Sequence, residues 1–113
     1  MNKLNAKKVA QIAAKLGWLK MPANVVTDAV LLIVRNYINT IADCCDESIC
    51  EDTALECILE LNATDIYLQL FIDDYHSLND VECHNLELSL RGEIEELMLK
   101  GYTFEEARRE YDV

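Results

Sequence analysis

The hydrophobic residues are most concentrated between about residues 24 and 42. Within this stretch, residues 29–34 form an unbroken apolar run between Asp28 and Arg35. On a helix, such a run covers nearly the whole circumference, and a helix of this kind must be surrounded by other elements. The uncharged run is shorter than the roughly 18 residues that a membrane span needs. The pattern therefore predicts the central helix of a bundle, with Asn24 as its N-cap.

Elsewhere, apolar residues recur every three or four positions, which is typical of amphipathic helices. The first expected helix starts at about Asn2 or Asn5 and ends at Leu16. The others cover about residues 48–61, 65–76, 80–99 and 104–111, and a single bent helix over 48–76 remains open. Gly17, Pro22 and Gly101 interrupt the pattern. Three pairs resemble capping boxes at helix starts: Ser48/Glu51, Asn79/Glu82 and Thr103/Glu106.

Each expected helix has a face that should be buried. In the first helix this face is Val9, Ile12, Ala13 and Leu16, followed by Trp18 and Leu19 packing back. In the helix over 48–61 it is Cys50, Ala54, Cys57, Ile58 and Leu61. In the helix over 65–76 it is Leu68, Phe71, Ile72 and Tyr75. In the helix over 80–99 it is Cys83, Leu86, Leu90, Ile94 and Leu97. Asp65, Gln69 and Asp73 should face outward, as should Glu87, Arg91 and Glu95.

Together these patterns predict an all-α fold: a compact bundle of five to six helices around the helix at 24–42, forming a single domain over 1–113. The composition agrees, because 51% of the 113 residues are hydrophobic and only three are Gly and one Pro. No signal peptide or transit segment is visible. The five cysteines are odd in number and lack the spacing of a secreted disulfide framework, so we expect free thiols in a reducing cytoplasm.

The charges are distributed unevenly. Residues 1–27 carry five lysines and no acid, whereas residues 28–113 carry all 21 acids and five basic residues. Between residues 36 and 90 there are 13 acids and no Lys or Arg. A surface of this kind repels nucleic acid and anionic lipid and attracts basic proteins. We therefore expect no direct nucleic-acid binding and no membrane association.

The candidate binding residues are the acids that follow the central helix. Asp52, Glu56 and Glu60 recur every four residues, and like charges at this spacing destabilise a helix. Something other than local helix stability should therefore maintain this row. The candidate partner-binding residues are Asp43, Asp46, Glu47, Glu51, Asp52, Glu56 and Glu60, with Asp65, Asp73 and Asp74 next.

The cysteines, histidines and acids of the chain give little indication of a catalytic or metal-binding site. Zinc sites use two paired C-x2–4-C or H-x3–5-H units, and Cys45-x4-Cys50 has no second unit to complete such a site. His76 and His84 have no evident nucleophile and orienting carboxylate beside them. The acids do not form a calcium-binding loop either. We expect a protein that is not an enzyme and uses no metal or cofactor.

Residues 9–17, Val-Ala-Gln-Ile-Ala-Ala-Lys-Leu-Gly, resemble the first helix and turn of a helix-turn-helix DNA-binding unit. The resemblance covers about 15 residues and implies that the following helix reads the major groove. That helix departs from the pattern, because it presents Asn24, Thr27 and Asp28 and then the apolar run. A DNA-binding regulator using Lys7, Lys8 and Lys15 is thus an alternative.

The favoured interpretation is an acidic, non-enzymatic interaction protein that docks on a basic protein. It could act as a nucleic-acid mimic that occupies the groove where a partner holds DNA or RNA. In size, helicity and acidity the chain is similar to phage-encoded inhibitors of host defence nucleases, including anti-CRISPR proteins, which implies a viral protein acting in the host cytoplasm. A further alternative is a homodimeric structural or assembly protein that uses surplus apolar residues, namely Trp18, Leu31, Leu32, Val34 or Leu99.

Overall fold

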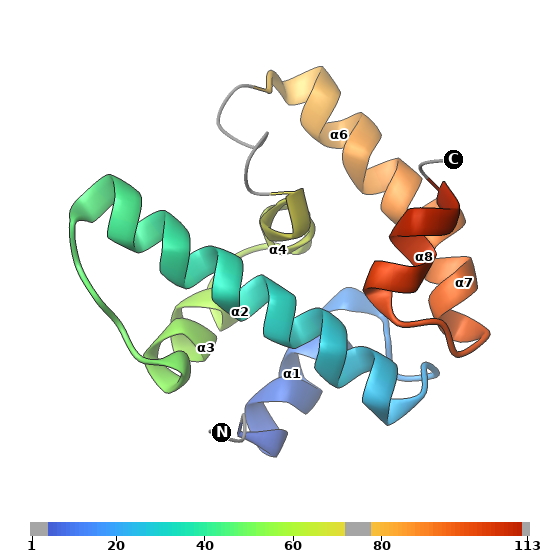
Figure 1. Cartoon of the computed structure of the whole chain (residues 1–113), viewed down its shortest axis with the longest axis horizontal. Coiled ribbons are helices and arrows are strands. Elements are labelled where there is room, and N and C mark those ends of the chain that lie inside the picture. The colour runs from blue at the N-terminus through green and yellow to red at the C-terminus, as the bar shows by residue number, and fades with distance from the viewer. Residues whose placement is uncertain (1–4, 72–77, 112–113) are drawn as a thin grey trace.

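The computed structural model describes residues 5–71 and 78–111, without the side chains of Phe71 and Tyr111. These residues form helices and irregular segments and contain no strand (Figure 1). Within residues 5–71 and 78–111 the helices assemble into a compact globule around α2 (Ala23–Cys45), as a bundle of six. The prediction of an all-α bundle of five to six helices around a central helix is confirmed.

α1 (Ala6–Leu16) begins after Asn5, the second of the two expected starts, and ends at Leu16 as predicted. The Asn5 side chain caps its start by accepting hydrogen bonds from the backbone N–H groups of Lys7 and Lys8. Gly17 ends the helix with a φ of 78°, a left-handed conformation that glycine adopts without a steric penalty. Trp18 then turns back, and its backbone N–H donates to the Ala13 carbonyl at 2.8 Å.

α2 is longer than the predicted helix at 24–42, because it starts one residue earlier and continues to Cys45. Pro22 occupies the N-cap position and no side chain caps this end, so the expected N-cap role of Asn24 is wrong. The fixed φ of proline already favours a helix start. The helix contacts α1, α3, η1 and α8.

The first half of α2 is its buried half. Six of its side chains lie in the core: Val25, Val26, Ala29, Val30, Ile33 and Val34. By length and composition alone α2 could cross a membrane, since a window of it has a mean hydropathy of 1.3. A core helix of a globule has the same composition. Its C-terminal turns extend beyond the other helices and are progressively exposed (Figure 1).

The segment after α2 contains two helices rather than one bent helix. α3 (Glu51–Leu59) starts at Cys50, whose Sγ accepts a hydrogen bond from the Thr53 backbone N–H, so the expected start at a Ser48 capping box is wrong. Asn62 caps α4 (Ala63–Leu68), which continues into the 3-10 helix η1 (Gln69–Phe71). The break between α3 and α4 therefore settles the alternative that the sequence leaves open.

The expected helix at 80–99 is continuous but contains a π-helical turn. It consists of α6 (Asp80–Ser89), the π-turn η2 (Leu90–Ile94) and α7 (Glu95–Leu99). The predicted capping box of Asn79 and Glu82 is present at its start. A π-turn inserts one extra residue into the helix. Because of this insertion, Met98 rather than Leu97 is fully buried after Leu90 and Ile94.

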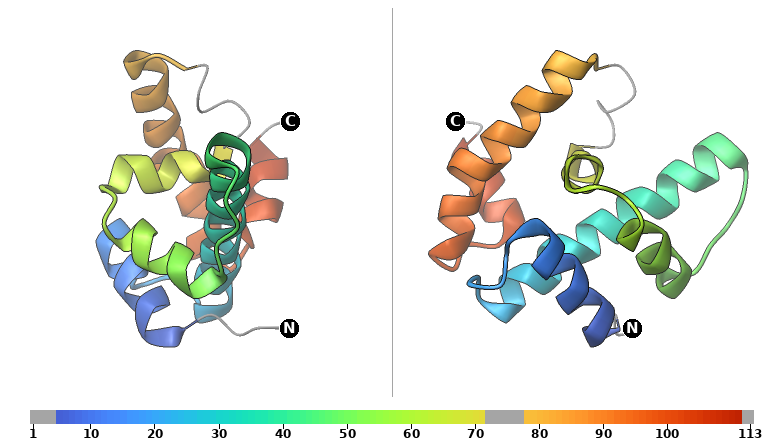
Figure 2. Two further views of the ribbon diagram at one scale, coloured as in Figure 1. Left: turned by 90° about the vertical axis from the view of Figure 1, so that its left-hand side faces the viewer. Right: turned by 180° about the vertical axis from the view of Figure 1, so that it is seen from behind.

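α8 (Phe104–Tyr111) matches the predicted helix at 104–111. Its expected capping box forms, since the Glu106 backbone N–H donates to Thr103 Oγ1 and the Thr103 N–H donates to Glu106 Oε1. Gly101 precedes it with a φ of 104°. α8 and α7 pack together at the N-terminal end of α2, on the opposite side of the molecule from the turn between α2 and α3 (Figures 1 and 2).

Several residues differ in burial from the expected faces. Cys50 is exposed, and Cys57, Cys83, Leu86 and Leu97 are half-buried, whereas Leu55, Ile66, Tyr67 and Leu70 lie in the core. Leu19, expected to pack back, is 72% exposed. Gln69, expected to face outward, is buried. Ile72 and Tyr75 lie outside the described residues, as do Asp73 and His76.

Candidate protein-interaction surfaces

Three of the predicted docking residues lie together in sequence where α2 ends. Asp43 is in the last turn, Asp46 is the C-cap residue, and Glu47 follows it in the turn to α3. All three are exposed, and none forms an ion pair with a described Lys or Arg. The C-terminus of a helix carries a partial negative charge of its own. We call Asp43, Asp46 and Glu47 the acidic end.

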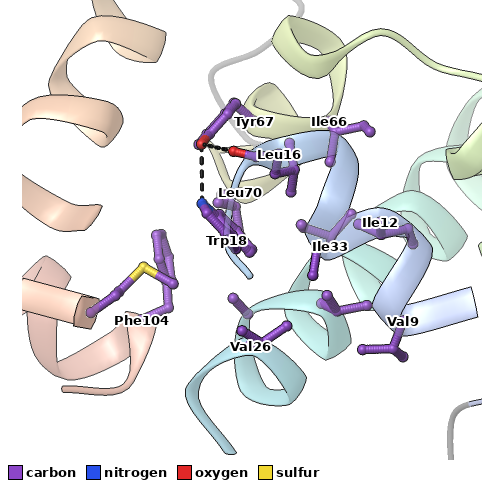
Figure 3. Packing of buried hydrophobic residues seen from close by; sticks show 14 of the residues in the cluster. Val9, Ile12, Leu16, Trp18, Val26, Ile33, Ile66, Tyr67, Leu70 and Phe104 are labelled. Atoms are coloured by element: carbon purple, nitrogen blue, oxygen red, sulfur yellow. Dashed lines mark hydrogen bonds between the residues drawn. The ribbon is translucent and has the colours of Figure 1, made fainter. Parts of the chain in front are cut away.

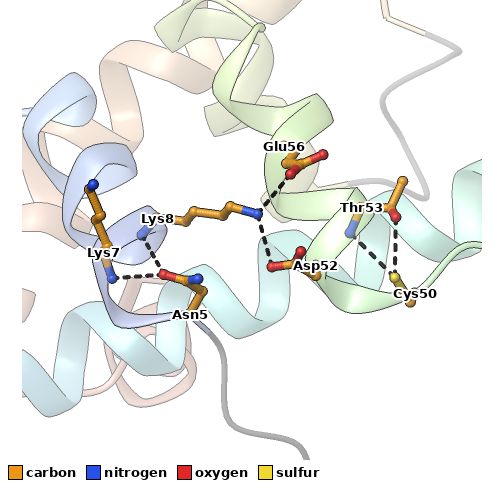
Figure 4. A network of polar contacts seen from close by, with 7 residues as sticks. All are labelled: Asn5, Lys7, Lys8, Cys50, Asp52, Thr53 and Glu56. Carbon is orange, nitrogen blue, oxygen red and sulfur yellow. Dashed lines mark hydrogen bonds and ion pairs between the residues drawn. The ribbon is translucent and has the colours of Figure 1, made fainter.

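The row of acids on α3, Asp52, Glu56 and Glu60, has a counter-ion from α1. Lys8 Nζ lies 2.9 Å from Asp52 Oδ1 and 2.9 Å from Glu56 Oε1 (Figure 4). These two hydrogen-bonded carboxylates raise the pKa of Lys8. A cation between two acids spaced four residues apart relieves their mutual repulsion. The packing of α1 on α3 therefore accounts for part of the acidic row without any partner.

The remaining predicted residues are dispersed over several elements. Glu60 is exposed at the C-cap of α3, whereas Asp65 is half-buried in the first turn of α4. Glu51 is half-buried and lines the groove described below. Asp73 and Asp74 lie outside the described residues. The acids thus divide into the acidic end, a row shared with Lys8, and single positions.

Two lysines of α1 have side chains that contact α3. Besides the Lys8 pairs, Lys15 Nζ donates to the Leu59 carbonyl at 2.7 Å. This carbonyl is the last of α3, where a cation is favoured by the helix dipole. Two of the three lysines named for a DNA-binding regulator therefore have intramolecular partners, and the first half of α2 is buried. No observation favours the regulator.

A buried polar network joins the turn after α1 to α4 and α7. Trp18, expected as a surplus surface residue, is 1% exposed and donates from Nε1 to Glu95 Oε2 at 2.7 Å and to Tyr67 Oη at 3.1 Å. Tyr67 Oη donates in turn to the Leu16 carbonyl (Figure 3). Arg91 lies over the Tyr67 ring, 4.6 Å from its centroid. Val34 is likewise buried rather than a surplus surface residue.

Glu95 therefore does not lie on the wet side of its helix, as the sequence pattern suggests. It is half-buried beside Trp18, and burial raises the pKa of its carboxyl group while the hydrogen bond from Trp18 opposes the shift. The expected ion pair of Arg91 with Glu87 is present at 3.6 Å. The sequence predicts that Trp18 packs back after α1, but it does not reveal the polar partners of Trp18, because Arg91 and Glu95 could equally face solvent in an isolated helix.

An open groove of about 640 Å³ lies between α1, the turn after it, and the first half of α2. Its walls are mostly small or apolar side chains from α1 and α2, and its polar lining residues are Thr27, Arg35 and Glu51. Trp18, Met21 and the exposed Leu19, from the turn after α1, also line it. α1 contacts α2, and the axes of the two helices are inclined to each other in the rear view of Figure 2. The pattern of amphipathic helices did not reveal this groove.

The cysteines are free thiols, and Cys44, Cys45 and Cys50 are exposed. Cys50 Sγ lies at the N-terminus of α3, 3.2 Å from Thr53 Oγ1. Hydrogen bonds from the Thr53 side chain and backbone lower the pKa of Cys50. Among the described residues, no group of three or more His, Cys, Asp or Glu side chains is arranged to hold a metal ion.

Comparison with known proteins gives no further assignment. No family model matches the chain, and no curated protein or solved structure shows significant similarity to it.

Proposed function

We propose that this chain is a non-enzymatic interaction protein whose acidic end docks on a basic surface of another protein. The observation that carries the proposal is the exposure of Asp43, Asp46 and Glu47 at a helix C-terminus without a described cation beside them. Carboxylates and the negative end of a helix dipole act in the same direction. Such a surface steers basic partners and forms charge-assisted hydrogen bonds with Arg and Lys.

The acids of α3 have a secondary part in this proposal. Asp52 and Glu56 already share Lys8, so a partner would have to compete with an intramolecular cation for them. Glu60 is exposed at the C-cap of the same helix and forms no ion pair with a Lys or Arg of the described part of the chain. The docking surface is therefore centred on the acidic end and extends to Glu60. In the nucleic-acid-mimic version of the proposal, these carboxylates take the place of phosphates in the partner's groove.

Charge-neutralised variants test the docking surface. One variant carries Asp43→Asn, Asp46→Asn and Glu47→Gln, and a matched control carries Glu93→Gln, Glu105→Gln and Glu110→Gln at exposed positions elsewhere. Asparagine also tolerates the left-handed backbone at position 46. The probe is an immobilised arginine-rich peptide in a salt titration. We expect the first variant to lose about tenfold in affinity, equivalent to about 1.4 kcal/mol, and the control to lose little. Equal losses would mean that only net charge matters.

A competition assay tests the mimic version. The same arginine-rich peptide is loaded with a fluorescent DNA duplex, and the chain is added. Release of the duplex by the native chain, but not by the variant of the acidic end, supports mimicry. Direct retardation of the duplex by the chain alone would instead support the DNA-binding regulator.

A further inference from the structure

We propose that Asp52 and Glu56 of α3 form a second contact for the basic partner, and that Lys8 of α1 occupies this contact in the free chain. We call Asp52 and Glu56 the α3 clamp. This contact rests on the proposed docking of a basic protein and extends it from the acidic end to α3. Arginine or lysine side chains of the partner bind the clamp in competition with the Lys8 ammonium group, so Lys8 is an autoinhibitory cation.

The Lys8 ammonium group indicates which ligand the α3 clamp accepts. Its Nζ atom lies 2.9 Å from Asp52 Oδ1 and 2.9 Å from Glu56 Oε1, so two carboxylates converge on one cation (Figure 4). The two acids lie four residues apart on α3, a spacing that places their side chains on one face of the helix. A cationic side chain of a partner offers the same donors and forms charge-assisted hydrogen bonds with carboxylates.

The clamp is accessible to a partner even though Lys8 occupies it. The side chains of Asp52 and Glu56 are 61% and 63% exposed, whereas the side chain of Lys8 is 19% exposed. Lys8 therefore contacts the clamp from the side that faces α1, and the two carboxylates remain open to solvent. Glu60 follows four residues later on α3 and is also exposed, so it continues the surface beyond the clamp.

Displacement of Lys8 does not require α1 to leave the core. Val9, Ile12 and Leu16 anchor this helix, and each is at most 9% exposed. The Lys8 side chain, by contrast, is a flexible stem that ends in a compact charge. Ion pairs with exposed carboxylates are weak and are screened by salt, so a partner with several cations can replace this one. Lys8 therefore tunes the affinity for a partner while the fold stays intact.

The other lysines of α1 do not occupy the clamp. Lys15 Nζ bonds to the Leu59 carbonyl at the end of α3. Lys7 forms no ion pair with an acid of the described ranges, and its side chain is directed away from Asp52 and Glu56 (Figure 4). Because Lys8 is attached beside the clamp, it acts at a high effective concentration, and an external cation must compete with it.

The adjacent lysines supply matched variants, because Lys8→Gln and Lys7→Gln change the net charge by the same amount. The probe is the immobilised arginine-rich peptide in a salt titration. We expect Lys8→Gln to raise the affinity for this peptide about fivefold at low salt, and Lys7→Gln to raise it about twofold or less. Lys8→Arg keeps the cation and should bind like the native chain. Circular dichroism checks that the variants fold.

A background that carries Asp52→Asn and Glu56→Gln removes the clamp. In this background, Lys8→Gln should raise the affinity no more than Lys7→Gln does. Equal gains from the two lysine variants of the otherwise native chain would overturn the proposal. A specific gain from Lys8→Gln that persists without the clamp would also overturn it, because Lys8 would then act through other residues.

Amine labelling tests the displacement of Lys8 directly. An arginine peptide with an acetylated N-terminus carries no reactive amine, so an amine-reactive ester labels only the chain. Lys8 should react more slowly than Lys7 in the free chain, because the two carboxylates hold its ammonium group and raise its pKa. Peptide binding should increase the labelling of Lys8 relative to Lys7, measured by mass spectrometry. An unchanged ratio would overturn the proposal.

The variant of the acidic end separates this proposal from the docking proposal. If that variant loses affinity while Lys7→Gln and Lys8→Gln give equal gains, docking at the acidic end stands and the clamp is overturned. If that variant keeps its affinity while Lys8→Gln alone gives the gain, the clamp is supported and the acidic end is not the docking surface.

Discussion

The Trp18 indole N–H donates a hydrogen bond to the Glu95 carboxylate at 2.7 Å, which joins the turn after α1 to the start of α7. These residues are far apart in sequence, and the hydrogen bond accounts for the buried position of Trp18 and the half-buried position of Glu95. The indole N–H of a buried tryptophan needs an acceptor. The carboxylate is held in a partly desolvated position that raises its pKa.

The first prediction concerns Glu95 and pH. Because its folded-state pKa lies above the usual 4.5, the folded chain binds this proton more tightly than the unfolded chain does. The resulting stabilisation is present below about pH 4.5 and is lost as pH rises through the raised pKa. Glu95→Gln should therefore gain stability relative to the native chain between acidic and neutral pH. Urea unfolding at several pH values measures this difference.

Glu93→Gln, at an exposed position of the adjacent π-turn, is the matched control for that experiment. A stability difference between the native chain and Glu95→Gln that stays constant over the whole range would contradict the predicted linkage.

The second prediction concerns Lys8. Lys8→Gln removes the cation between Asp52 and Glu56, which leaves two acids facing each other on adjacent turns. We expect a loss of stability that shrinks toward about 1 M salt, where the screening length is about 3 Å. The loss should vanish in a background carrying Asp52→Asn and Glu56→Gln. Lys7→Gln is the control, and an equal effect of that change would show that general charge, not this ion pair, is responsible.

The third prediction concerns Asp46, the non-glycine residue with a positive φ (53°) among those described. Asp tolerates the left-handed region better than most residues, but glycine is preferred at this position after a helix. Asp46→Gly should be more stable than Asp46→Ala by about 1 kcal/mol. Thermal and urea unfolding give the comparison. If the alanine variant were the more stable, the helix would not end in this conformation in solution.

The fourth prediction concerns Cys50. Hydrogen bonds from Thr53 lower its pKa and increase the reactive thiolate fraction near neutral pH. Cys50 should react with iodoacetamide several-fold faster than the similarly exposed Cys44 and Cys45. Peptide mass mapping after brief labelling measures the order. Thr53→Val removes the hydroxyl but keeps the backbone N–H, so it should reduce the advantage of Cys50, and labelling led by Cys44 or Cys45 in the native chain would refute the prediction.

The parts of the fold that the sequence predicts are those set by local chemistry. Gly17 and the Asn79/Glu82 and Thr103/Glu106 pairs determine helix ends through contacts within a few residues, and all were recognised. The start of α3 was missed because cysteine is an unusual N-cap. The π-turn was missed because a search at a period of 3.6 residues assumes regular spacing throughout a helix.

The candidate surfaces were harder to predict because they depend on how helices are placed in three dimensions. Burial of Gln69 and Glu95 requires partners that are distant in sequence. The pairing of Lys8 with α3 had a signal, namely a basic first segment beside a body without Lys or Arg over residues 36–90. The docking role of the acidic end stays a prediction. No sequence pattern predicted the groove between α1 and α2, since small residues on a helix face do not show whether another helix covers them.

The π-turn at residues 90–94 also determines which way α6 is rotated. Each residue of a helix advances about 100° around the axis, so removing one residue here would turn every upstream side chain by that angle relative to the core. Val81 and Leu88, now exposed, would then point in a new direction. The deletion of one codon would thus rotate α6 as a unit in one evolutionary step. A different face of α6 would then be exposed to solvent, while Leu90 and the buried residues after it would stay in the core.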